Sequence, residues 1–436
     1  MWYLEHFSSV GIDPDPHARK SSFCDIHHNG DIVPHITSSV VHHFDSSQML
    51  KHVVLPDQLR ITELYGKQGI TWQDIQTETR HNIVIEMPAH WIFLLTDRQL
   101  TFITDRFHLL LTDFEDGGMH AHNDIPTRFM KLKHPPKRAV IYATSSTHIN
   151  SLPKINLHHV HVPYWLLYNS SLSHSRYHDN MQHYLDTIAQ SKYPKQLVFL
   201  NLKPRLYRLK SLLYMFKQGT LDNPALEWSL ADSVYKITGK GVREDLQTEL
   251  VKHEKFSQQI VGSLTDSEKQ LYTQFIDTYE LPKLYSPVDN MVQILNSNPD
   301  DFAVFNWSYC VETYYGNELP LRFGMGTSSF LTEKTYKSFM QASMPLTLCE
   351  GDTYNYLTNL GFRIDNQQLD CYTSSEERFI NIMHLIDDIL EHGIEPNRDN
   401  IVHNFELIAN IEHTAHIYNQ CLINIVDTLT IHNQDL

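Results

Sequence analysis

The sequence predicts an α/β protein with two α/β domains, and two features carry that prediction. Short apolar runs bounded by polar or Pro-containing turns recur through the first half of the chain, which is the pattern of buried strands. In the second half, residues 330–362 combine a helix, a short apolar strand, an acidic Gly turn and a second helix, which together form one α/β unit. The length of 436 residues is enough for each domain to bury a core.

The first half of the chain predicts a polar lead segment followed by a sheet. Residues 1–45 are polar and contain Asp-Pro-Asp-Pro and Asn-Gly breakers, and the first α/β domain is expected over residues 46–190. An amphipathic helix is expected over residues 173–191. Strands are expected at 82–86 (NIVIE), 91–95 (WIFLL), 108–112 (HLLLT), 139–143 (AVIYA) and 158–162 (HHVHV).

The second α/β domain is expected over residues 195–400, with residues 401–436 as a closing helical segment. It begins with a buried strand at 197–201 (LVFLN) and a helix at 205–219 that stops at Gly219. The further expected elements are a polar helical interval at 244–279, strands at 302–305 and 309–311, and closing helices at 375–392 and 400–429.

Composition limits the classes of partner. The net charge of −16 argues against a surface that coats nucleic acid, although a local basic groove stays compatible with it. No apolar run reaches the roughly 18 residues of a membrane helix, so no membrane partner is expected. The five cysteines are scattered without a CxxC pair, and the N-terminal residues lack a basic segment followed by an apolar core. These features predict a cytoplasmic protein with reduced thiols.

A basic cluster follows the strand at 197–201. Asn201 ends that strand, Lys203 follows, and Arg205 and Arg208 are three residues apart, so they share one face of a first helical turn. Guanidinium groups beside a helix N-terminus form a clamp for a diphosphate. The competing interpretation is a solvent-exposed basic helix.

A second cluster begins the helix of the α/β unit. If Thr332 is the N-cap, Glu333 lies in the first turn, where the helix dipole favours it, and Lys334 is unfavourable there unless an anion is present. Glu333 is expected to hold ribose or sugar hydroxyls and Lys334 to neutralise phosphate. Glu312 follows the expected strand at 309–311. The competing interpretations are a capped helix with an acidic start and a surface carboxylate at a strand end.

These segments together resemble the donor-binding region of GT-B-type glycosyltransferases. The Thr332-Glu333-Lys334 triplet with its following helix is similar to that of fucosyltransferase-like enzymes. Residues 197–230, the Val311-Glu312-Thr313 block and residues 370–378 resemble blocks of phage and large-virus proteins in the same order. The chain departs from that pattern at Tyr207, where the family usually has His.

The resemblance implies two Rossmann-like domains facing a cleft and a hexosyl- or pentosyltransferase that uses a nucleotide-diphosphate sugar as co-substrate. It implies neither a cofactor nor a catalytic metal. The implied donor-site residues are Asn201, Lys203, Arg205, Arg208, Glu312, Glu333 and Lys334. The acceptor is expected to be a hydroxymethylated base in phage DNA, a saccharide or a protein, and the basic residues between 131 and 138 offer a surface for nucleic acid.

The acceptor side rests on the polar loop after the strand at 108–112. Its candidates for the general base are Glu115, Asp116 and His120, because loops at the carboxyl edge of a sheet commonly carry catalytic groups. The same loop contains an H-x-H-x-D pattern at 120–124, which leaves a metal-dependent hydrolase as an alternative. A non-catalytic protein that keeps the GT-B-like fold is the other alternative.

Overall fold

The structure is a computed structural model. It describes residues 84–93, 95–113, 124–144, 152–201, 205–230, 260–279, 302–312, 331–349, 352–371 and 374–434. The chain divides into two compact units. The first unit comprises Met1–His178 and Ala409–Leu436, and the second comprises Asp179–Ile408, so the chain returns to the first unit after completing the second.

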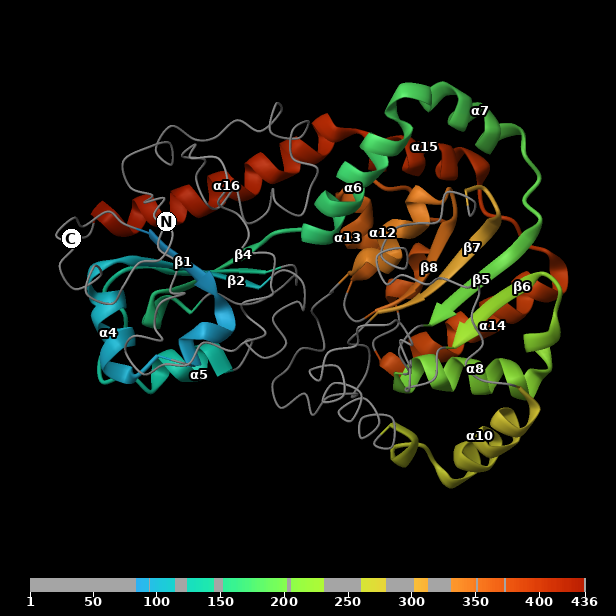
Figure 1. Ribbon diagram of the computed structural model, residues 1–436, viewed down its shortest axis with the longest axis horizontal. Coiled ribbons are helices and arrows are strands. Elements are labelled where there is room, and N and C mark those ends of the chain that lie inside the picture. The colour runs from blue at the N-terminus through green and yellow to red at the C-terminus, as the bar shows by residue number, and fades with distance from the viewer. Residues whose placement is uncertain are drawn as a thin grey trace, which may run out of the picture. The chain divides into compact units, whose positions relative to one another are not determined.

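The first unit contains a parallel sheet of strand order β1-β2-β3-β4. Parallel pairing confirms the α/β class predicted from the sequence. Helices α4 and α5 lie on one side of this sheet and α16 lies on the other (Figure 1). The described elements are β1 (Val84–Pro88), η4 (Ala89–Phe93), α4 (Asp97–Arg106), β2 (His108–Asp113), α5 (Asp124–Met130), β3 (Val140–Thr144), η5 (Pro153–Ile155), β4 (Leu157–His161), α6 (Tyr164–Tyr177) and α16 (Ile411–Gln434).

The core of the first unit follows from strand alternation. Leu109 and Leu111 of β2 point to the same face because side chains two apart in a strand share a face. They pack with Val140 and Tyr142 of β3 and with Ile103 of α4 in one buried cluster. The predicted strands at 108–112, 139–143 and 158–162 are confirmed within one or two residues.

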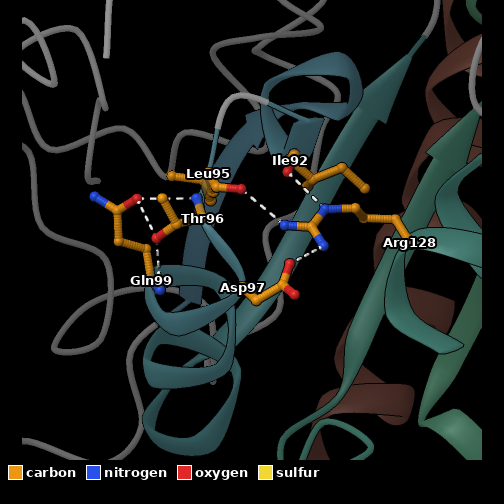
Figure 2. A network of polar contacts seen from close by, with 6 residues as sticks. All are labelled: Ile92, Leu95, Thr96, Asp97, Gln99 and Arg128. Atoms are coloured by element: carbon orange, nitrogen blue, oxygen red, sulfur yellow. Dashed lines mark hydrogen bonds and ion pairs between the residues drawn. The ribbon is translucent and has the colours of Figure 1, made fainter. Parts of the chain in front are cut away.

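The predicted strand at 91–95 is wrong, because Ala89–Phe93 form the 3-10 helix η4. A short apolar run does not distinguish a strand from a buried helical turn. Arg128 of α5 fixes this turn: its guanidinium donates to the carbonyl oxygens of Ile92 at 3.4 Å and Leu95 at 2.7 Å, and it pairs with the Asp97 carboxylate (Figure 2). The orphan carbonyls at the end of the turn therefore have a donor.

Two predicted helices are interrupted in the structure. The predicted helix at 173–191 is two helices, α6 and α7 (Met181–Gln190), joined by a 3-10 turn at His178–Asn180. The predicted helix at 400–429 breaks at Asn410, whose side-chain Oδ1 accepts the N–H groups of Glu412 and His413 at 3.1 Å each. Asn410 thereby caps the new helix α16, as Asn commonly does at a helix start.

The second unit contains a parallel sheet of strand order β6-β5-β7-β8. The strand β6 was not predicted. The strand expected at 309–311 is the end of β7, which begins at Phe305, whereas residues 302–304 of the strand expected at 302–305 are not in a strand. The described elements are α7, β5 (Lys195–Asn201), α8 (Leu206–Gln218), η7 (Thr220–Asp222), β6 (Leu226–Leu230), α10 (Asp266–Thr278), β7 (Phe305–Val311), α12 (Glu333–Met340), β8 (Met344–Leu348), α13 (Thr353–Asn359), η9 (Gln367–Cys371), α14 (Ser375–His392) and α15 (Arg398–Ala409).

Gly219 ends α8 as the sequence predicts, and it has a left-handed φ of +73°. We expect Gly219→Ala to lower the free energy of unfolding by about 1 kcal/mol, because L residues are strained in this conformation. The added Cβ would meet no heavy atom within 4 Å, so backbone strain alone is tested. The matched control is Gly262→Ala, since Gly262 also has open space and no positive φ. Urea unfolding should show a loss for the first variant and none for the control.

The buried Tyr193 hydroxyl is expected to lower the free energy of unfolding when it ionises at alkaline pH. Its hydroxyl donates to the carbonyl of Ala342 at 2.9 Å, and burial raises the pKa of Tyr193 to about 12 although the guanidinium of Arg398 acts in the opposite direction. A pKa raised in the folded state favours folding below the unfolded value of about 10, and this contribution, about 2–3 kcal/mol, is lost as pH rises from 10 to 12. Urea unfolding across that range should show a steeper decline for the wild type than for Tyr193→Phe. Equal slopes would contradict the assignment.

Candidate functional site

The carboxyl edge of the second sheet contains a topological switch point between β5 and β7. The chain leaves β5 towards β6 on one side and leaves β7 towards β8 on the other, as the strand order shows. The two connecting helices lie on opposite faces (Figure 1). Tyr309 of β7 bonds to Ser211 of α8 at 2.9 Å, whereas the next residue, Cys310, contacts Ser338 of α12 at 3.4 Å. In open α/β sheets, ligands bind at such a point.

Arg208 brings positive charge to this edge from α8. The side chain is buried with 5% exposure, and its Nε and Nη2 donate to the carbonyl oxygen of Val311 at 3.2 and 2.9 Å. Val311 is the last residue of β7, so the guanidinium satisfies a carbonyl where the sheet ends. The solvent-exposed basic helix considered for this segment is therefore wrong for Arg208.

Asn201 and Arg205 flank the same edge on the β5 side. Asn201 is buried at the end of β5, where its N–H donates to the Ser229 hydroxyl at 3.1 Å, and its side-chain Nδ2 lies 3.4 Å from the Ser229 carbonyl. Arg205 is the N-cap of α8, and its side chain does not cap the helix. Leu200, the preceding strand residue, is 38% exposed, which is unusual for a central strand. Lys203 lies outside the described residues.

Glu312 lies directly after β7 and is buried with 1% exposure. Its Oε1 accepts the Thr332 N–H at 3.1 Å and the Thr335 hydroxyl at 2.6 Å, and its Oε2 accepts the Thr332 hydroxyl at 2.5 Å. The carboxylate thus fastens the start of α12 to the end of β7. It is not the surface carboxylate considered from the sequence, and its predicted contact with donor hydroxyls stays a prediction.

Thr332 is the N-cap of α12, as the sequence predicts. Its Oγ1 accepts the Lys334 N–H at 3.4 Å and the Lys334 Nζ at 2.9 Å. Lys334 is half-buried, and this second hydrogen bond holds its ammonium group beside the N-cap of α12. Glu333 begins the helix, and its side chain is outside what the structure describes.

A second buried arginine at this edge was not among the predicted site residues. Arg378 of α14 donates through Nη1 to the carbonyl of Cys349, directly after β8, at 2.5 Å, and its Nη2 lies 3.9 Å from Asp370. Asp370 accepts the Asn355 N–H at 2.7 Å, and burial raises the pKa of its carboxyl group. The sequence offered only the resemblance of residues 370–378 as a signal for this pair.

The predicted acceptor-side residues Glu115, Asp116 and His120 lie outside the described residues, as does most of the H-x-H-x-D pattern. In the described part of the chain, no group of three or more His, Cys, Asp or Glu side chains is arranged to hold a metal ion. Among the helices that the structure describes, none combines the length and apolar character needed to cross a bilayer.

Comparison with known proteins adds no relative. Neither a protein-family model, nor a curated protein, nor a solved structure matches this chain.

Proposed function

We propose that this protein is a glycosyltransferase that moves a sugar from a nucleotide-diphosphate donor to a hydroxyl acceptor. The donor diphosphate would bind at the carboxyl edge of the second sheet, between the starts of α8 and α12. Arg205, Arg208 and Lys334 would supply the positive charge. A GT-B-like arrangement of two Rossmann-like domains around a cleft is part of this proposal.

One observation carries it: sequence segments more than a hundred residues apart meet at the switch point. Arg208 contacts Val311, and the adjacent Glu312 contacts Thr332, so Arg208 of α8 and the start of α12 belong to the same edge. Both helix starts carry cations, Arg205 and Arg208 on α8 and Lys334 on α12.

The chemistry follows from the leaving group. The acceptor oxygen forms a bond to the anomeric carbon while the bond from that carbon to the diphosphate oxygen breaks, and the acceptor proton passes to a general base. Charge develops on the departing nucleoside diphosphate. Preorganised guanidinium, ammonium and helix N–H groups stabilise such charge. Glu115, Asp116 and His120 remain our candidates for the base.

The acceptor follows from the resemblance alone. A hydroxymethylated base in phage DNA would be consistent with a protein working in the host cytoplasm, and such an enzyme would have to flip the base out of the duplex.

A thermal-shift screen with UDP, GDP, ADP and CMP tests the donor site. We expect one nucleoside diphosphate to raise the melting temperature, because a ligand at about 100 times its Kd stabilises the folded state by about 2.7 kcal/mol. Arg205→Ala and Lys334→Ala should each reduce the shift. Lys217→Ala is the matched control, since it removes the same charge from the exposed last turn of α8.

Either of two results would overturn the proposal. Absence of a shift with every nucleotide would favour the non-catalytic alternative. A shift of wild-type size in both Arg205→Ala and Lys334→Ala would place nucleotide binding elsewhere. Zinc found in the purified protein by elemental analysis, together with no nucleotide shift, would favour the metal-dependent hydrolase.

A further inference from the structure

We infer that Glu312 and Thr332 form a relay that positions the ammonium group of Lys334, and that Glu312 itself does not touch the donor. This inference rests on the proposed function, because it assigns Lys334 to the donor phosphate. It gives Glu312 and Thr332 the role of positioning residues.

The relay begins with the fixed carboxylate. Glu312 is nearly fully buried, and the three described hydrogen bonds to its carboxylate come from neutral groups of Thr332 and Thr335. Thr335 contacts the Thr347 hydroxyl of β8 at 3.2 Å, so the carboxylate is held from the helix and the sheet together. The carboxylate oxygens of Glu312 are therefore directed into the protein. A donor hydroxyl could reach them only by displacing Thr332 or Thr335.

The carboxylate sets the orientation of the Thr332 hydroxyl. An ionised carboxylate only accepts hydrogen bonds, so the Thr332 proton must point at Oε2. The lone pairs of Thr332 Oγ1 then point away from Glu312, and they accept the Lys334 N–H and Nζ. The ammonium group is therefore held at the first turn of α12, where the helix dipole alone would repel it.

An incoming phosphate would find this ammonium already in place. A flexible lysine loses side-chain entropy when it binds an anion, and a side chain positioned beforehand loses less. The relay thus preorganises the Lys334 ammonium group for phosphate binding. The sequence alone shows only a lysine close to an N-cap residue.

Three substitutions separate the relay from a general structural role. Thr332→Val keeps the shape of the side chain and removes the hydroxyl. Thr332→Ser keeps the hydroxyl. Glu312→Gln keeps one oxygen that accepts from the Thr332 N–H and the Thr335 hydroxyl. Its amide NH₂ group, however, donates to Thr332 Oγ1. That oxygen then has a single lone pair for the two Lys334 donors.

Nucleotide affinity is the first measurement, by calorimetry with the nucleoside diphosphate that shifts the wild type. We expect Thr332→Val and Glu312→Gln to raise Kd by about tenfold, as the loss of one charge-assisted hydrogen bond implies, and Thr332→Ser to bind like the wild type. In a Lys334→Ala background, Thr332→Val should cause no further loss, because the relay acts through that lysine. A purely structural role would weaken binding in both backgrounds.

Labelling of Lys334 with an amine-reactive acetylating reagent, followed by mass spectrometry, tests the relay without any ligand. Thr332→Val and Glu312→Gln should label several-fold faster than the wild type and Thr332→Ser at the wild-type rate, because a hydrogen-bonded amine reacts more slowly. Wild-type labelling rates in all three variants would overturn the relay, as would wild-type Kd values when Lys334→Ala weakens binding. If the wild type binds no nucleotide, the proposed function fails and the labelling rates alone decide the relay.

Discussion

Replacing Arg378 with alanine should lower the free energy of unfolding of the second unit by about 3 kcal/mol or more. The side chains of Arg378 and Asp370 are 6% and 4% exposed, so the substitution leaves a buried carboxylate without its cation. It also leaves the Cys349 carbonyl without the donor that lies 2.5 Å away. Urea unfolding followed by tryptophan fluorescence, to which the buried Trp228 and Trp307 of the second unit contribute, would measure the loss.

The pH dependence of that loss identifies its cause. Burial raises the pKa of Asp370, and removal of Arg378 raises it further, because that guanidinium favours the charged carboxylate. A pKa raised in the folded state gives stability that is present at low pH and lost as pH rises, so the deficit of Arg378→Ala should shrink in acid. The double variant Arg378→Met with Asp370→Asn should recover part of the loss, since it removes both charges. A deficit independent of pH would contradict the role of the ion pair.

Local signals in the sequence predicted much of the second unit. The short run at 197–201 is mostly apolar, and it lies within the strand β5. Gly219 stops α8 because glycine adopts a left-handed φ without strain. Thr332 caps α12 because its hydroxyl reaches a backbone N–H two residues ahead. Each of these features depends on neighbours a few residues away, which a single sequence contains.

The sequence did not predict features that depend on distant partners. The run at 91–95 became a helical turn whose end carbonyls bind Arg128, a residue more than thirty positions away. The contacts of the Glu312 carboxylate with Thr332 and Thr335 were not predicted, because only the fold brings these hydroxyl and N–H groups to it. Arg378 was likewise not predicted as a site residue, because its contact with Cys349 depends on the packing of α14 against the sheet.

Replacing Arg208 should lower both the stability of the protein and its binding of nucleotide. Arg208→Met should lower the free energy of unfolding by about 2 kcal/mol, because the buried Val311 carbonyl loses both of its N–H donors from the guanidinium. It should also abolish the nucleotide-induced thermal shift, because a charge at the switch point is removed. Urea unfolding and the nucleotide screen measure the two effects separately.

Arg208→Lys distinguishes a binding role from a structural one. Lysine keeps the positive charge, but a compact ammonium group does not reproduce the planar fork that directs two N–H groups at one carbonyl oxygen. If the charge at the carboxyl edge binds the donor phosphate, Arg208→Lys should lose stability and keep part of the nucleotide shift, whereas Arg208→Met loses both. If Arg208 only fastens α8 to the end of β7, both variants should lose stability and keep the full shift. In that case, Arg205 and Lys334 would be the cations of the proposed site. The N-cap residue Arg205 would then be the only cation that the start of α8 supplies to the phosphate.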